Sequence, residues 1–230
     1  MAKVFDCSVD TELLAGMRAS KMAIGKGELV VLPTDTVYGL ACDAFSASAV
    51  ERLLQAKGRD RQSPPPVLIA NVQTLDALAA EVPQVAKSLA EKFWPGALTM
   101  ILKAQPSLTW DLGETKGTVA LRVPDHKIAL ALLEETGPLA VSSANLTKQP
   151  AATSVPAAQE MLGDAVAAYL DSGVTPGNTA STILDLTEVV DRASIDGTLV
   201  PSGKIRVVRV GAISTEEIRK VTGDIEVVEA

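Results

Sequence analysis

Pro-Thr-Asp-Thr-Val-Tyr-Gly-Leu, residues 33–40, is the stretch of sequence that says most about the fold. It directly follows the largely apolar residues 28–32, which the pattern predicts to be a strand entering the core. The chain thus passes at once from a buried strand to hydroxyl, carboxylate and phenol groups. Such groups are costly to desolvate unless the protein itself or a ligand binds them. Two further polar clusters, at 57–59 and 142–145, stand in comparable positions downstream.

The composition is that of a folded protein with a large core. A length of 230 residues allows one large domain or two small ones, and 47% hydrophobic residues are enough for a buried core. The mean hydropathy of +0.22 excludes a disordered chain. Aromatic residues make up only 3%, so Ala, Val and Leu must fill most of that core.

The location and redox state follow from what the sequence lacks. No apolar run approaches the roughly 20 residues of a membrane span, and the N-terminus lacks the apolar region of a signal peptide. We therefore expect a cytoplasmic protein that does not act at a membrane. Cys7 and Cys42 are too few for a disulfide scaffold, and Cys42 is expected to be a small buried residue.

The net charge of −7 argues against nucleic-acid binding as the main activity. A protein that holds nucleic acid chiefly through its phosphates is normally basic. Small anionic ligands stay compatible with this charge, because a few converging cations make the potential of a pocket positive whatever the net charge of the protein.

The hydrophobic periodicity alternates between helix and strand and predicts an α/β chain with a mixed sheet, in one domain over residues 1–230. Ser48 and Glu51 fit a capping box at the start of one helix. Residues 197–203 form the only loose polar connection of any length. The expected helices are 10–26, 48–56, 74–80, 83–93, 126–135, 156–162 and 214–221. The expected strands are 28–33, 67–70, 98–102, 118–123, 138–142, 166–170, 182–186 and 205–210.

Several common catalytic motifs are missing from the sequence. It has no P-loop, no G-x-G-x-x-G fingerprint, no H-E-x-x-H and no G-x-S-x-G elbow. His126 is the only histidine and stands at a predicted helix start, where a capping or surface role is expected. One histidine and two distant cysteines cannot supply a zinc site, so no protein-bound metal is predicted. The chemistry that stays possible is one that works by positioning the reacting groups and by stabilising charge electrostatically.

Each polar cluster has a structural and a functional interpretation. Lys57 and Arg59 follow a predicted helix, where cations complement the helix dipole but also suit phosphate binding. Residues 142–145 either cap the next turn or bind a ligand at the carboxyl end of a strand. Arg122 closes a predicted core strand and needs an anionic partner, which is either a structural carboxylate or a bound anion. Ser181 and Arg209, each taken alone, favour structural roles.

Taken together, these pieces resemble the YrdC/Sua5 family of L-threonylcarbamoyladenylate synthases, in its short single-domain form. No single piece is diagnostic, but they occur in the family's order across residues 10–215. The matching stretches are 33–40, 57–59, 93–99, 119–124, 143–145, 181–182 and 209–211.

The resemblance implies a fold and a reaction. The fold is a twisted mixed sheet flanked by helices around a deep, positively lined cavity. The reaction converts L-threonine, bicarbonate and ATP to threonylcarbamoyl-AMP and pyrophosphate, with Mg²⁺ bridging the ATP phosphates. The product would pass to downstream threonylcarbamoyl-transferase proteins for the t6A modification of tRNA, and the chain itself would meet tRNA at most weakly or indirectly.

The resemblance also implies roles for particular residues. Those implied for threonine are Thr34, Arg122, Ser143 and Ser181. Those implied for the nucleotide are Lys57, Arg59, Asn145, Thr153 and Arg209, with Lys57 and Arg59 as the catalytic cations. Preorganised cations suit this reaction because negative charge builds up on the phosphoryl oxygens.

Two other functions stay open at this point. One is a carbamoyl-transfer module of the hydrogenase-maturation type, which uses carbamoyl phosphate but normally belongs to a much larger chain. The other is a non-enzymatic RNA-binding module, against which the acidic charge counts.

Overall fold

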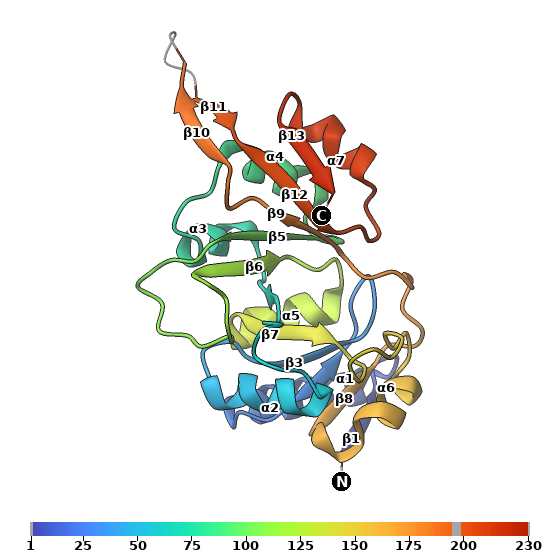
Figure 1. Ribbon diagram of the computed structural model, residues 1–230. Coiled ribbons are helices and arrows are strands. Elements are labelled where there is room, and N and C mark those ends of the chain that lie inside the picture. The colour runs from blue at the N-terminus through green and yellow to red at the C-terminus, as the bar shows by residue number, and fades with distance from the viewer. Residues whose placement is uncertain (1, 195–198, 230) are drawn as a thin grey trace.

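The computed structural model describes residues 2–194 and 199–229, and its centre is one 11-stranded sheet (Figure 1). The strands of this sheet are β1 (Lys3–Asp6), β2 (Val30–Leu32), β3 (Gly39–Asp43), β4 (Val67–Leu68), β5 (Leu98–Lys103), β6 (Thr118–Arg122), β7 (Leu139–Ser143), β8 (Ala168–Asp171), β9 (Thr182–Asp185), β12 (Lys204–Arg209) and β13 (Glu226–Glu229). Their spatial order is β1-β8-β2-β3-β7-β4-β6-β5-β9-β12-β13. Both parallel and antiparallel pairs occur along it, so the sheet is mixed, as the sequence predicts.

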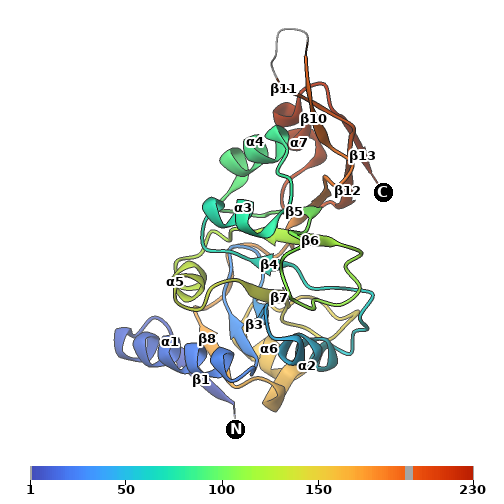
Figure 2. The ribbon, with the colours of Figure 1, turned by 90° about the vertical axis from the view of Figure 1, so that its left-hand side faces the viewer.

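Helices pack on this sheet along its whole length. They are α1 (Asp10–Gly25), α2 (Ala47–Lys57), α3 (Leu75–Leu78), α4 (Gln84–Phe93), α5 (Lys127–Thr136), α6 (Val155–Leu162) and α7 (Thr215–Thr222), with short 3₁₀ turns η1 (Val72–Thr74) and η2 (Gly163–Ala165). Figures 1 and 2 show α1, α2 and α6 at the end that carries the N-terminus and α4 and α7 at the other end. A small hairpin of β10 (Val190–Ala193) and β11 (Leu199–Ser202) projects beyond α4.

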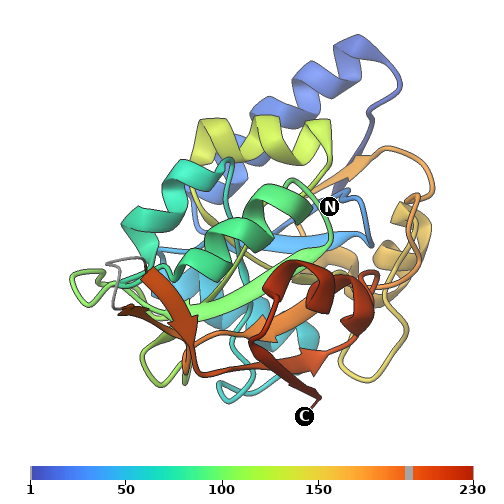
Figure 3. The same ribbon diagram turned by 90° about the horizontal axis from the view of Figure 1, so that it is seen from above.

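Two clusters of apolar side chains form the core. Helices α1 and α5 lie side by side (Figure 3) and pack on one cluster with residues of β2, β7 and β8. The other helices and most of the remaining strands share the second, larger cluster. Cys42 is fully buried in that cluster, as predicted. None of the helices in the described ranges is long and apolar enough to cross a membrane.

The structure corrects the sequence prediction around residues 33–40. The predicted strand 28–33 is shorter, and a strand that was not predicted, β3, begins at Gly39 and pairs antiparallel with β2, with Leu32 opposite Gly39. The polar residues between them are therefore a tight connection between two buried strands. β3 also pairs with β7, where Gly39 lies opposite Ser143. This pairing places the 33–38 connection beside the end of β7.

Other boundaries differ in smaller ways. α2 is capped by Ser46, whose hydroxyl accepts the amide of Ala49 at 3.3 Å, so the predicted capping box at Ser48 is wrong. Strands β1, β10 and β13 were not predicted, because they are short and partly exposed. The predicted loose connection 197–203 falls partly outside the described residues, and its described remainder, 199–203, contains the whole of β11, so a loose connection is wrong there.

Candidate functional site

A cavity of about 350 Å³ opens beside the central strands, a volume typical of small-molecule sites. It is enclosed by the connection 33–38 and the end of β7 on one part of the wall. Strands β5, β6 and β9 and the segments around residues 59–66 and 208–209 form the rest. Its polar lining consists of Thr34, Thr36, Tyr38, Arg59, Thr99, Thr115, Thr118, Arg122, Ser142, Ser143, Ser181 and Arg209. Its apolar lining includes Leu68, Ile101, Val141, Ile183, Val208 and the prolines 64–66.

Arg122 is the most deeply buried cation of the cavity wall, with a side-chain exposure of 8%. Its Nη2 donates to Oδ1 of Asp35 at 2.6 Å, its Nη1 to Oγ1 of Thr36 at 3.1 Å, and its Nε to the carbonyl of Gly96 at 2.9 Å. Burial lowers the pKa of Arg122, and the carboxylate of Asp35 opposes that shift. The sequence left two anionic partners open for Arg122, a structural carboxylate or a bound anion. The structure shows a structural carboxylate, that of Asp35.

Arg59 and Arg209 have no carboxylate partner among the residues that the structure describes. Nη1 of Arg59 donates to Oγ of Ser142 at 3.2 Å. Nε and Nη2 of Arg209 donate to the carbonyl of Ser181, at 3.0 and 2.7 Å. These two guanidinium groups therefore keep their charge available to a bound anion.

The three arginines converge on the same space. All three line the one cavity, and burial together with the positive charges of Arg122 and Arg59 lowers the pKa of Arg209. Burial likewise lowers the pKa of Arg59. Because guanidinium keeps its proton well above neutral pH, the cavity carries an excess of positive charge in a protein that is acidic overall.

Hydroxyl groups complete the polar wall of the cavity. Oγ1 of Thr34 donates to the carbonyl of Val37 at 2.6 Å and accepts the amide of Thr36 at 3.2 Å. Oγ of Ser181 lies 2.9 Å from Oγ1 of Thr99. Ser143 ends β7 and lines the cavity. The wall thus offers several hydroxyls beside a buried arginine, an arrangement suited to an amino acid.

The structure separates the predicted site residues into two groups. Six of them line the cavity: Thr34, Arg59, Arg122, Ser143, Ser181 and Arg209. The other three do not. Lys57 and Asn145 contact each other behind the end of β7, and Thr153 precedes α6, where its carbonyl accepts the amide of Thr175 at 2.9 Å.

The residues of the 33–38 connection that had no predicted role serve the architecture. Asp35 and Thr36 hold the guanidinium of Arg122, and Asp35 also accepts the amide of Asp125 at 3.0 Å. The phenol of Tyr38 donates to the carbonyl of Gly173 at 2.6 Å and accepts the amide of Ser172 at 3.0 Å. The connection is thereby fixed at both of its ends.

His126 precedes α5, as predicted, but its side chain does not cap that helix. Its Nδ1 is buried with no hydrogen-bond partner in the described part of the chain, and burial lowers its pKa. The imidazole is therefore neutral near neutral pH.

Two polar residues of the cavity wall had no individual role in the sequence prediction: Ser142, which was considered only as part of the cluster 142–145, and Thr99. Ser142 holds Arg59, and Thr99 pairs with Ser181. The alternation of side chains along β5 could have indicated Thr99. Thr99 and Ile101 face the cavity, whereas Leu98 and Met100 are buried in the core.

The fold and the site define an α/β protein with a cationic cavity for a small anionic ligand. The family model described as telomere recombination (Sua5/YciO/YrdC) matches residues 22–194, so the chain belongs to the Sua5/YrdC family.

Comparisons with individual proteins agree with this assignment. A putative threonylcarbamoyl-AMP synthase of Mycobacterium leprae is 44% identical over 97% of this chain and 95% of its own. The structure of Pyrococcus abyssi Sua5 complexed with L-threonine matches with a TM-score of 0.82 and 32% identity, over 99% of this chain and 62% of that one. Escherichia coli YciO matches with a TM-score of 0.76 and 25% identity, over 95% of this chain and all of its own. The predicted family and fold class are therefore confirmed.

Proposed function

We propose that this chain is a threonylcarbamoyl-AMP synthase, which makes threonylcarbamoyl-AMP, pyrophosphate and water from L-threonine, bicarbonate and ATP. The observation that carries the proposal is the convergence of Arg59, Arg122 and Arg209 on one hydroxyl-lined cavity. The relatives named for this activity, and the threonine complex of a Sua5 protein, support it.

The chemistry fits the charges of the cavity. The amine of threonine combines with bicarbonate to give a carbamate and water. An oxygen of that carbamate then attacks the α-phosphorus of ATP, and the bond from this phosphorus to the β-phosphate oxygen breaks, which releases pyrophosphate. Negative charge grows on the phosphoryl oxygens, where preorganised guanidinium groups stabilise it. Arg59 and Arg209 suit this role because no carboxylate of the described residues neutralises them.

The threonine end of the cavity is assigned to Arg122 and the hydroxyls of Thr34, Ser143 and Ser181. Arg122 keeps a fixed orientation through its bonds to Asp35, Thr36 and Gly96, so its remaining N–H groups are preorganised for an α-carboxylate. The nucleotide end is assigned to Arg59 and Arg209, which line the cavity. Lys57, Asn145 and Thr153 do not line it.

Magnesium enters this account as part of the substrate. Within residues 2–194 and 199–229, no three His, Cys, Asp or Glu side chains are placed to hold a metal ion together. Mg²⁺ is often held by substrate phosphates and water with few protein ligands, so MgATP is the expected form of the nucleotide. The product is expected to pass in the cytoplasm to downstream transferase proteins that modify tRNA.

A pyrophosphate-release assay tests the proposal. With MgATP, release should require threonine and bicarbonate together, and it should fall to background with serine or with no acceptor. Release that depends on carbamoyl phosphate instead would favour the hydrogenase-maturation type of module. No release under any condition, with a steeply salt-dependent RNA affinity, would favour an RNA-binding module.

A further inference from the structure

Lys57 lies in a different environment from the other cations of the site. The residue is only 1% exposed and does not line the cavity. Its ammonium donates to the carbonyl of Ser143, to the carbonyl of Asn145 at 2.7 Å, and more distantly to Oδ1 of Asn145 at 3.5 Å. All three donors of the ammonium are therefore directed at the last residue of β7 and the segment that follows it.

The end of α2 explains why Lys57 and Arg59 diverge. Gly58 is the C-cap of α2 and has a left-handed backbone, with φ of 59° and ψ of 43°. The chain reverses there, so that Lys57 points into the protein and Arg59 lines the cavity. Arg59 bonds Ser142 while Lys57 bonds Ser143 and Asn145, so the two cations hold successive residues of one segment.

The segment 143–149, which we term the β7 loop, begins at the last residue of β7, which lies opposite Gly39 of β3. The amide of Thr147 donates to the backbone carbonyl of Lys57 at 2.9 Å, and the amide of Ala144 donates to the backbone carbonyl of Tyr38 at 2.8 Å. The side-chain amide of Asn145 donates to the carbonyls of Leu146 and Gln149, both at 2.8 Å, which closes the loop on itself. Lys57 thus ties the β7 loop to α2 through both its backbone and its side chain.

We propose that Lys57 is a positioning residue, whose ammonium holds the carbonyls of Ser143 and Asn145 so that the β7 loop presents Ser143 to threonine. This inference rests on the proposed function and changes the role expected of Lys57 from a phosphate ligand to an organiser of the threonine site. The two roles differ in one consequence. A phosphate ligand matters only when ATP is bound, whereas an organiser of the β7 loop matters for threonine alone.

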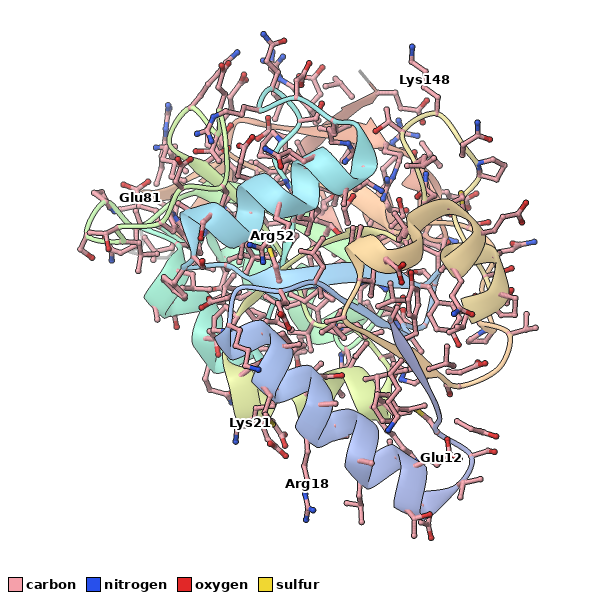
Figure 4. The ribbon with its side chains drawn as sticks, turned by 90° about the horizontal axis from the view of Figure 1, so that it is seen from below. Glu12, Arg18, Lys21, Arg52, Glu81 and Lys148 are labelled. Carbon is pink, nitrogen blue, oxygen red and sulfur yellow. The ribbon has the colours of Figure 1, made fainter. Side chains whose placement is uncertain are left out.

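The test is the dissociation constant for threonine without nucleotide, measured by calorimetry on the full chain. Lys57→Met should weaken threonine binding by about 10-fold, the effect of losing a charge-assisted hydrogen bond. Lys148→Met is the matched control. Lys148 belongs to the same loop but is exposed and points away from the protein (Figure 4), so its loss should leave threonine binding unchanged. Equal binding by the wild type and Lys57→Met would overturn the inference, whereas no binding by the wild type would count against the proposed function itself.

A second measurement uses pH. Burial, with a smaller contribution from the charge of Arg59, lowers the pKa of Lys57 to about 7. Between about pH 6 and about pH 8.5 the ammonium therefore loses its proton while Arg59 keeps its own. The affinity of the wild type for threonine should fall over this range, and that of Lys57→Met should change less. If Lys57→Met does not fold, a flat wild-type curve over the same range would overturn the inference.

Discussion

Replacing Arg59 by alanine is expected to lower the rate of pyrophosphate release by on the order of 10³-fold, the scale on which an arginine stabilises a phosphoryl-transfer transition state. Arg59 lines the cavity and has no carboxylate partner in the described ranges, so its charge is available to the phosphates. Among the described residues its side chain bonds to Ser142 alone, so the free energy of unfolding should change little. Steady-state pyrophosphate release and thermal unfolding measure the two effects separately.

Arg52→Ala is the matched control for Arg59→Ala. Arg52 lies on α2, the helix after which Arg59 follows, where it is exposed and donates to the carbonyl of Gly27 (Figure 4). Its removal takes away the same charge at a distance from the cavity, so turnover should stay close to that of the wild type. Comparable losses in the two variants would show that net charge, not the position of Arg59, controls the rate. Full activity of Arg59→Ala would remove Arg59 from the mechanism.

Arg122→Met is expected to lower the free energy of unfolding by about 3–5 kcal/mol, because it leaves a buried carboxylate without its cation. The carboxylate is that of Asp35, whose side chain is only 15% exposed and lies 2.6 Å from Arg122. The same variant should lose threonine binding, because the buried guanidinium is the cation assigned to the substrate carboxylate. Urea unfolding and threonine calorimetry report the two losses.

A double variant separates these two roles of Arg122. Asp35→Asn combined with Arg122→Met removes both charges of the pair, so much of the lost stability should return. Threonine binding should not return, because the guanidinium is still missing. Recovery of threonine binding in the double variant would show that Arg122 serves only to neutralise Asp35.

The sequence predicts the α/β class and most elements, because long periodic segments such as α1 and α4 carry strong patterns. It does not predict β3. This strand follows a polar connection and begins with a glycine, so its residues do not read as a separate strand. Sequence alone also places the helix cap at Ser48, since Glu51 three residues later fits a capping box, whereas the structure uses Ser46.

The candidate site could be predicted as a set of residues but not as a geometry. The partner of Arg122 is 87 positions away in the chain, and only the sheet brings Asp35 to it. Lys57 and Arg59 look alike in the sequence, yet the left-handed turn at Gly58 sends one behind the wall and the other into the cavity. Such differences arise from tertiary packing, which local patterns do not contain.

The most direct test of the central claim is to identify the adenylate formed from ATP, threonine and isotope-labelled bicarbonate. Mass spectrometry of the quenched reaction should find an acyl adenylate, the mixed anhydride of AMP and the carbamate, that contains both threonine and the labelled carbon, in an amount equal to the pyrophosphate released. An adenylate without the label, or one that forms from carbamoyl phosphate without threonine, would contradict the assignment of this cavity to threonylcarbamoyl-AMP synthesis.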